Sequence, residues 1–194
     1  MAVHPGFADP VLDGQRVFRA VLEAMAHPGR VVELSTSLEC PSPLGVAATA
    51  ACLALLDFET PLWLDDAART MAVTAYLRFH CGVPLVPAPA DACVALTAEP
   101  ARLPPLEAFA AGTVERPDRS ATVIVEVEAL DDRRGWRLTG PGIADVARLA
   151  APGLPAGFPA ELRANRARFP CGVDLILTVG RRLAALPRTT RVED

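Results

Sequence analysis

Apolar residues recur along this chain at two spacings, one typical of helices and one typical of strands. The first clear pattern is DGQRVFRAVLEAMAHPG, residues 13–29, in which apolar residues lie three and four positions apart. Asp13 is placed to cap the start of this helix, and Pro28 with Gly29 is placed to end it. The pattern therefore predicts an amphipathic helix near the start of the chain.

The same patterns predict elements along the rest of the chain. Helices are expected over residues 43–57, 68–80 and 157–169, with a short one over 104–112. Strands are expected over residues 30–34, 60–65, 93–97, 121–130 and 135–143, and as a hairpin turning near Gly180 within 172–187. The polar stretch DDRRG is expected to be a turn that makes 135–143 the neighbour of 121–130.

Alternation of these helices and strands predicts an α/β fold. Because hairpins interrupt the alternation, we expect a mixed sheet with helical layers, not an all-parallel one. The proline-rich pieces 84–89, 100–105 and 152–159 are too short to link domains, so we expect a single domain over residues 1–194.

Composition indicates a chain that folds without covalent or metal support. At 194 residues and 51% apolar, it is long enough to bury roughly 70% of its unfolded surface. The longest apolar run, 43–56, is too short to span a bilayer, and residues 1–10 lack the features of a signal peptide. The five cysteines include no CxxC pair, so we expect no metal site and a soluble cytoplasmic protein.

Charge is unevenly distributed along the chain. The net charge is −4, but residues 1–132 carry 8 arginines and 18 acidic residues, whereas residues 133–194 carry 11 arginines and 5 acidic residues. Either the two halves pair within the molecule, or one of them faces a charged partner or ligand. Nucleic acid is not expected, because the whole chain is acidic and only 5% aromatic.

All 19 basic residues are arginine, so the chain contains no lysine. It therefore has no lysine side chain for a Schiff base and none for a P-loop. This excludes lysine-dependent pyridoxal chemistry and P-loop nucleotide chemistry.

The stretch LRFHCG, residues 77–82, contains side chains that occur in active sites. His80 and Cys81 are adjacent in sequence, so their side chains point in different directions and a nucleophile–base pair is disfavoured. Arg78 and His80 lie at the predicted end of a helix, where cations offset the negative end of its dipole. The alternative is that they bind an anion together with residues from elsewhere.

A second candidate for anion binding is LPRTT, in which Arg188, Thr189 and Thr190 offer a guanidinium and two hydroxyls. The alternative is a terminal strand with a polar edge. The glycines of RLTGPGI, residues 137–143, favour a turn, because the third glycine of a dinucleotide-binding fingerprint is missing. No catalytic triad, carboxylate pair or metal cluster stands out, so we expect no catalytic residues, metal or cofactor.

Several motifs, taken in order, resemble the PhnH family of the bacterial carbon–phosphorus lyase system. They are FRAVLEAMAHPG (18–29), ETPLWL (59–64), LRFH (77–80), GT (112–113) with ATVIVEV (121–127), RLTGPGI (137–143), FPCGVDLILT (169–178) and LPRTT (186–190). The resemblance is collinear from about residue 7 to 193.

The resemblance implies a three-layer α/β/α fold similar to the large domain of pyridoxal-phosphate-dependent transferases, without that cofactor. It implies a homodimer that joins PhnG, PhnI and PhnJ in a core complex. It also implies a requirement, with PhnG, PhnI and PhnL, for forming ribose 1-phosphonate 5-triphosphate from MgATP and a phosphonate, with adenine displaced. The direct role is expected to be structural; the alternative is binding of an anionic substrate or intermediate through Arg78 or Arg188.

Overall fold

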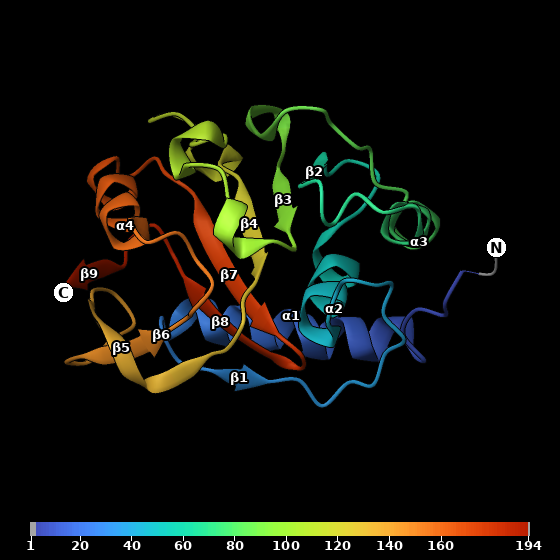
Figure 1. The fold of residues 1–194 in the computed structure, drawn as a ribbon, viewed down its shortest axis with the longest axis horizontal. Coiled ribbons are helices and arrows are strands. Elements are labelled where there is room, and N and C mark those ends of the chain that lie inside the picture. The colour runs from blue at the N-terminus through green and yellow to red at the C-terminus, as the bar shows by residue number, and fades with distance from the viewer. Residues whose placement is uncertain (1–2, 194) are drawn as a thin grey trace.

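The computed structural model describes residues 3–193 and has a mixed six-stranded sheet at its centre. The strand order is β1-β8-β7-β4-β3-β2 (Figure 1). These strands span β1 Val32–Glu33, β2 Leu62–Leu64, β3 Val94–Thr97, β4 Thr122–Glu126, β7 Asp174–Val179 and β8 Arg182–Leu186. Strands β2, β3, β4 and β7 are parallel to one another, whereas β8 is antiparallel to both β7 and β1.

Three helices cover one face of this sheet: α1 Pro10–Ala26, α2 Val46–Leu55 and α3 Met71–Cys81. Successive strand residues point to opposite faces, so Leu62, Ile124 and Ile176 pack beneath these helices. Helix α2 is buried along most of its length because it consists largely of alanine and other small residues.

The other face is covered by α4 Phe158–Ala167 and a small antiparallel sheet in the order β6-β5-β9. Its strands are β5 Asp131–Thr139, β6 Ala147–Ala150 and β9 Arg191–Glu193. The predicted α/β class and mixed sheet are confirmed. The second covering layer, however, is one helix and a sheet instead of helices alone.

Most predicted helices and strands are present within a few residues of their expected bounds, but two predictions are wrong. Residues 104–112 contain only a single 3-10 turn, Leu106–Ala108. Pro104 and Pro105 lack backbone N–H groups, and the next amide, that of Leu106, is bonded to the Glu161 carboxylate on α4 at 2.9 Å. The carboxylate thereby caps the turn, and the turn ends at Phe109 because that residue is extended (φ −95°, ψ 158°) and buried against Trp63.

The second error concerns the neighbour of β4. Strand β5 begins at Asp131, so DDRRG is part of a strand instead of a turn, and β5 pairs with β6 and β9. Both edges of β4 are already occupied by β3 and β7. Gly135 adopts a positive φ of 96°, and a Cβ there would lie 2.3 Å from the Leu149 carbonyl oxygen, so glycine is required where β5 bulges against β6.

The N-cap of α1 is Asp9, not the predicted Asp13. The Asp9 carboxylate accepts hydrogen bonds from the amides of Val11 and Leu12 at 3.1 and 2.9 Å. Asp13 bonds back to the Asp9 amide at 3.1 Å, so it supports the cap from inside the helix. None of the described helices is long and apolar enough to cross a membrane.

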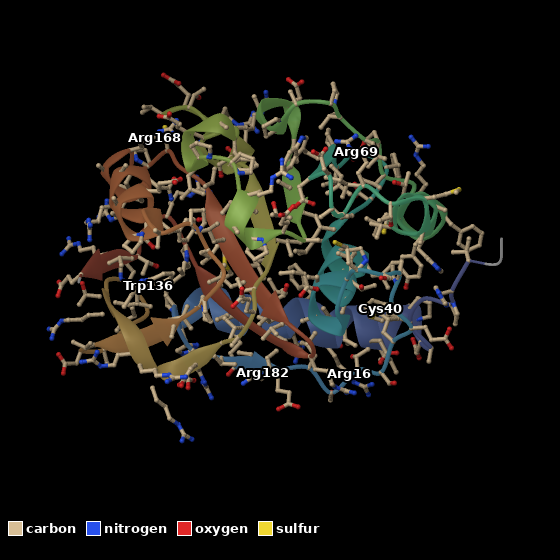
Figure 2. All side chains as sticks on the ribbon, in the orientation of Figure 1. Arg16, Cys40, Arg69, Trp136, Arg168 and Arg182 are labelled. Atoms are coloured by element: carbon tan, nitrogen blue, oxygen red, sulfur yellow. The ribbon has the colours of Figure 1, made fainter. Side chains whose placement is uncertain are left out.

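The uneven distribution of charge along the sequence corresponds to an uneven distribution of arginines in the fold. Most arginines after residue 132 lie on α4 and on the small sheet, and their nitrogen-tipped side chains project from the left-hand end of Figure 2, near Arg168 and Trp136. Most ion pairs between described residues, such as Arg30–Glu23 and Arg137–Glu193, join residues of the same half of the chain, and Arg134–Asp131 crosses the division. Because such pairs rarely join the two halves, the end of the molecule formed by α4 and the small sheet keeps an excess of positive charge.

Candidate functional site

A hollow of about 860 Å³ lies where two of the sequence motifs meet. Residues 27–30 follow α1, and residues 140–146 connect β5 to β6. The two segments touch directly: a Cβ on Gly142, whose φ is 82°, would lie 2.1 Å from the Ala26 carbonyl oxygen. The glycines of this motif therefore permit a close packing contact, which agrees with the predicted turn.

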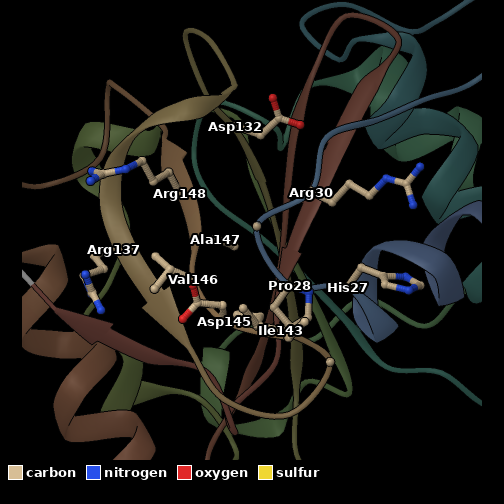
Figure 3. A pocket seen from close by; sticks show the side chains of 13 residues that line it. His27, Pro28, Arg30, Asp132, Arg137, Ile143, Asp145, Val146, Ala147 and Arg148 are labelled. Carbon is tan, nitrogen blue, oxygen red and sulfur yellow. The ribbon is translucent and has the colours of Figure 1, made fainter.

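The cations around this hollow do not point at a common centre. Arg137 and Arg148 extend from neighbouring strands to one side, whereas His27 and Arg30 extend to the other (Figure 3). Asp132 also lines the hollow. This arrangement does not form a compact anion cradle.

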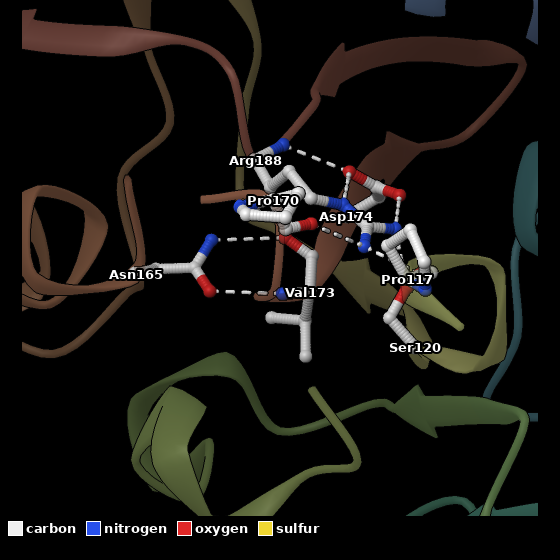
Figure 4. A network of polar contacts seen from close by, with 7 residues as sticks. All are labelled: Pro117, Ser120, Asn165, Pro170, Val173, Asp174 and Arg188. Carbon is white, nitrogen blue, oxygen red and sulfur yellow. Dashed lines mark hydrogen bonds and ion pairs between the residues drawn. The ribbon is translucent and has the colours of Figure 1, made fainter. Parts of the chain in front are cut away.

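Arg188 lies in the turn between β8 and β9, and its guanidinium points into the protein (Figure 4). Its Nε and one terminal nitrogen bond to the two carboxylate oxygens of Asp174 at 3.1 and 2.5 Å. The other terminal nitrogen donates to the carbonyl oxygens of Pro117 and Pro170 at 2.8 and 3.4 Å. A further bond reaches the Ser120 hydroxyl, so all five guanidinium donors have partners.

A second set of bonds holds the segment before Asp174. The Asn165 side-chain amide donates to the Val173 carbonyl and accepts from the Val173 amide, both at 2.9 Å. Gly172 has a φ of 118°, and a Cβ on it would lie 2.8 Å from the Asn165 oxygen. The motif FPCGVD thus follows a fixed path between α4 and β7.

These contacts give LPRTT a structural role at the amino end of β7. The Arg188 side chain is only 14% exposed. The Thr189 carbonyl accepts a bond from Arg166 at 3.2 Å, and Thr190 is buried. Anion binding by Arg188, Thr189 and Thr190 stays a prediction, and it would require this network to open.

Arg78 and His80 lie on different sides of α3. Arg78 is exposed and has no ion pair with any residue among 3–193. The Nε2 atom of His80 lies 2.9 Å from the His4 carbonyl oxygen, which can only accept, so this nitrogen carries the proton. The ring also packs against Tyr76, with 4.4 Å between the ring centroids and 53° between the ring planes. Through its bond to His4, His80 fastens the N-terminal segment to α3.

Cys81 does not pair with His80. Its thiol points toward the Cys52 carbonyl oxygen at 3.9 Å, and burial raises the pKa of the thiol to about 11. A thiol with so high a pKa is largely protonated at neutral pH and is a poor nucleophile. The geometry agrees with the expectation that no dyad forms.

The structure does not bring the two predicted groups of site residues together. Helix α3, with Arg78 and His80, lies at the right of Figure 1, whereas the turn before β9, with Arg188, lies at the left. No cluster of metal-binding side chains is found among the described residues.

A polar contact that sequence analysis missed lies at the carboxyl end of β4. The Glu126 carboxylate accepts a hydrogen bond from the Gly45 amide at 2.5 Å, at the N-cap of α2, where glycine offers no capping side chain. Burial raises the pKa of Glu126, and the bond from Gly45 only partly opposes the shift. The only signal in the sequence is the alternation of Glu126 and Glu128 late in the predicted strand 121–130, which does not reveal this contact.

Taken together, the fold and its internal polar contacts define an α/β domain in which the distinctive motifs support the architecture. The chain belongs to the PhnH family, described as bacterial phosphonate metabolism protein (PhnH), whose model matches residues 5–193.

Two relatives extend the comparison. The chain is 41% identical over 187 residues to the alpha-D-ribose 1-methylphosphonate 5-triphosphate synthase subunit PhnH of Rhizobium meliloti (strain 1021), covering 96% of this chain and 94% of that protein. It is 34% identical over 181 residues to HtxG of Stutzerimonas stutzeri, a protein named as a C-P lyase subunit, covering 92% of this chain and 85% of that one.

We expect Arg188→Lys to destabilise the protein by roughly 3 kcal/mol, because lysine cannot supply five donors in a planar fork and leaves buried acceptors unpaired. The free energy of unfolding in urea measures this. Arg168→Lys, at an exposed position after α4, is the matched control and should change stability by less than about 0.5 kcal/mol. Equal effects in the two variants would contradict the structural role of Arg188.

Glu126→Gln should stabilise the protein more at pH 8 than at pH 4. The folded-state pKa of Glu126 lies above its ordinary value of 4.5, so the folded state holds the proton more tightly than the unfolded state. Stability is therefore lost as the pH rises from about 4.5 through the folded pKa. Glutamine keeps an oxygen for the Gly45 amide without a charge. A wild-type minus variant difference that does not change with pH would refute this assignment.

Cys81→Ser should leave phosphonate utilisation intact when it replaces the native subunit in a phosphonate-using strain. The reason is that the thiol is protonated and has no base in contact. Growth on a phosphonate is the measurement, and sedimentation and circular dichroism control for folding. Loss of growth with a folded variant would indicate that the Cys81 thiol has a functional role.

Proposed function

We propose that this chain is a structural subunit of the enzyme that forms alpha-D-ribose 1-methylphosphonate 5-triphosphate, within the carbon–phosphorus lyase complex. The observation that carries the proposal is 41% identity, over nearly the whole of both chains, to a subunit of that synthase. We propose PhnG, PhnI and PhnJ as its partners, with MgATP and a phosphonate as the substrates of the assembled enzyme. The proposal extends to a fold like the large domain of pyridoxal-phosphate-dependent transferases, used without that cofactor.

An exposed apolar surface supports an assembly role. One surface, which we call the α3 face, consists of Met71, Arg78 and Phe79 on the exposed side of α3 and of Phe58 from the connection that follows α2. Phe58, Met71 and Phe79 are 74%, 76% and 72% exposed, respectively. Phe58 lies against the end of this helix, because its Cβ is 3.6 Å from where a Cβ on Gly82 would be.

The composition of the α3 face is that of a protein interface. Phenylalanine, methionine and arginine are enriched in interface cores, and exposed apolar clusters are uncommon on isolated soluble domains. A face of this kind can pair with its own copy across a two-fold axis. We therefore propose that it forms a homodimer, or that another subunit takes the place of the second copy in the complex.

The test combines Met71→Glu with Phe79→Glu. We expect the wild-type chain to sediment as a dimer at micromolar concentration and the double variant as a monomer, because two charges would be buried at the interface. Val114→Glu, at an apolar residue 70% exposed elsewhere on the surface, is the control and should remain dimeric.

Co-expression with PhnG, PhnI and PhnJ, followed by native mass spectrometry, tests assembly of the wild-type chain. A wild-type chain that is monomeric and joins none of these subunits would contradict the proposal. The variant Arg78→Gln distinguishes the structural role from the alternative, an anion-binding subunit. Loss of nucleotide or phosphonate binding with normal assembly would favour the anion-binding subunit.

A further inference from the structure

The outer face of the small sheet is rich in arginine. Strand register places Arg137 of β5 directly opposite Arg148 of β6 and Glu193 of β9, and Thr139 opposite Arg191. The alternate residues of these strands, such as Leu138 and Leu149, are fully buried. The arginines therefore share the exposed side of one sheet, which we call the basic face, defined by Arg137, Arg148 and Arg191.

The positive charge of the basic face is only partly neutralised within the chain. Arg137 pairs with Glu193 at 2.8 Å. Arg148 and Arg191 are exposed and form no ion pair with any described residue. Arg137 and Arg148 also face each other across neighbouring strands, a like-charge arrangement that is unfavourable in an isolated sheet. An external anionic partner would pair with Arg148 and Arg191 and would offset the repulsion between Arg137 and Arg148.

The shape of the basic face favours a broad partner over a small anion. Neighbouring strands are about 4.8 Å apart, so the three arginines are spread across the surface of the sheet. Arg137 and Arg148 also line the hollow between residues 27–30 and 140–146, but its cations diverge and it contains Asp132 and Asp145 as well (Figure 3). Planar guanidinium groups suit carboxylates on a protein surface. The net charge of −4 opposes long-range attraction of nucleic acid.

The basic face is unsuitable as the interface of a two-fold homodimer. In a two-fold dimer the same surface patch contacts itself, so a basic face at the axis would place Arg148 and Arg191 against their own copies. Such an interface would be repulsive. The α3 face can lie at a two-fold axis, whereas the basic face is left for a different chain.

We propose that the basic face binds an acidic surface of another subunit in the phosphonate-processing complex. This inference rests on the proposed function, since it requires the chain to assemble with other subunits. The α3 face and the basic face would then serve different partners, the first through apolar contact and the second through ion pairs between arginine and carboxylate groups.

The test is the double variant Arg148→Glu/Arg191→Glu, co-expressed with PhnG, PhnI and PhnJ. The matched control is Arg19→Glu/Arg119→Glu, which makes the same change in net charge at exposed arginines away from the basic face. We expect the face variant to weaken association by at least tenfold and to flatten its dependence on NaCl concentration, because charged interface residues govern both. The control should stay within about twofold of wild type, and both variants should remain folded dimers.

The possible results separate this inference from the function on which it rests. Wild-type assembly with equal binding by the face variant and the control would overturn the inference and leave the proposed function standing. Failure of the wild-type chain to assemble would overturn both. Normal assembly of the face variant, with loss of binding to a single-stranded oligonucleotide, would also overturn it in favour of a nucleic acid partner.

Discussion

The ion pair between Arg188 and Asp174 is the contact that links the two parts of this fold. It joins the start of β7, in the central sheet, to the turn that leads into β9, in the small sheet. The same guanidinium also binds the segment at Pro117 and Ser120, just before β4. One side chain thus fixes where three distant segments meet. Because breaking a buried pair leaves an uncompensated charge, the arrangement is held strongly.

The position of β9 follows from this contact, and the basic face follows from β9. With β9 fixed, β5 acquires a partner on its second edge, and Leu138 and Val192 are buried while Arg137 and Arg191 remain outside. In this structure Arg188 and its neighbours in LPRTT support the position of that surface, whether or not they also bind an anion. Of the exposed arginines on that surface, Arg148 and Arg191 lie in none of the sequence motifs, and Arg137 lies in RLTGPGI, whose glycines indicated only a turn.

Local patterns were sufficient for most of the elements but not for their assembly. Helical spacing predicted α1 and α3, and β-branched residues predicted β4, because these features depend on neighbours in sequence. The role of Arg188 depends on Asp174, 14 residues away, and on Pro117, 71 residues away. The position of β5 depends on both edges of β4 being occupied. Nothing in the local sequence distinguishes Asp174 from any other acidic residue at the start of a strand.

A fixed interior and two chemically different surfaces suit the proposed role of connecting other subunits. Hydrogen–deuterium exchange of the chain, alone and in the complex, tests this role most directly. We expect slower exchange in β5, β6 and β9 on assembly, and no change near Arg188 when a nucleotide or phosphonate is added to the isolated chain. Ligand-dependent protection of residues 170–190 in the isolated chain would contradict it, because it would place substrate binding where we find only structural contacts.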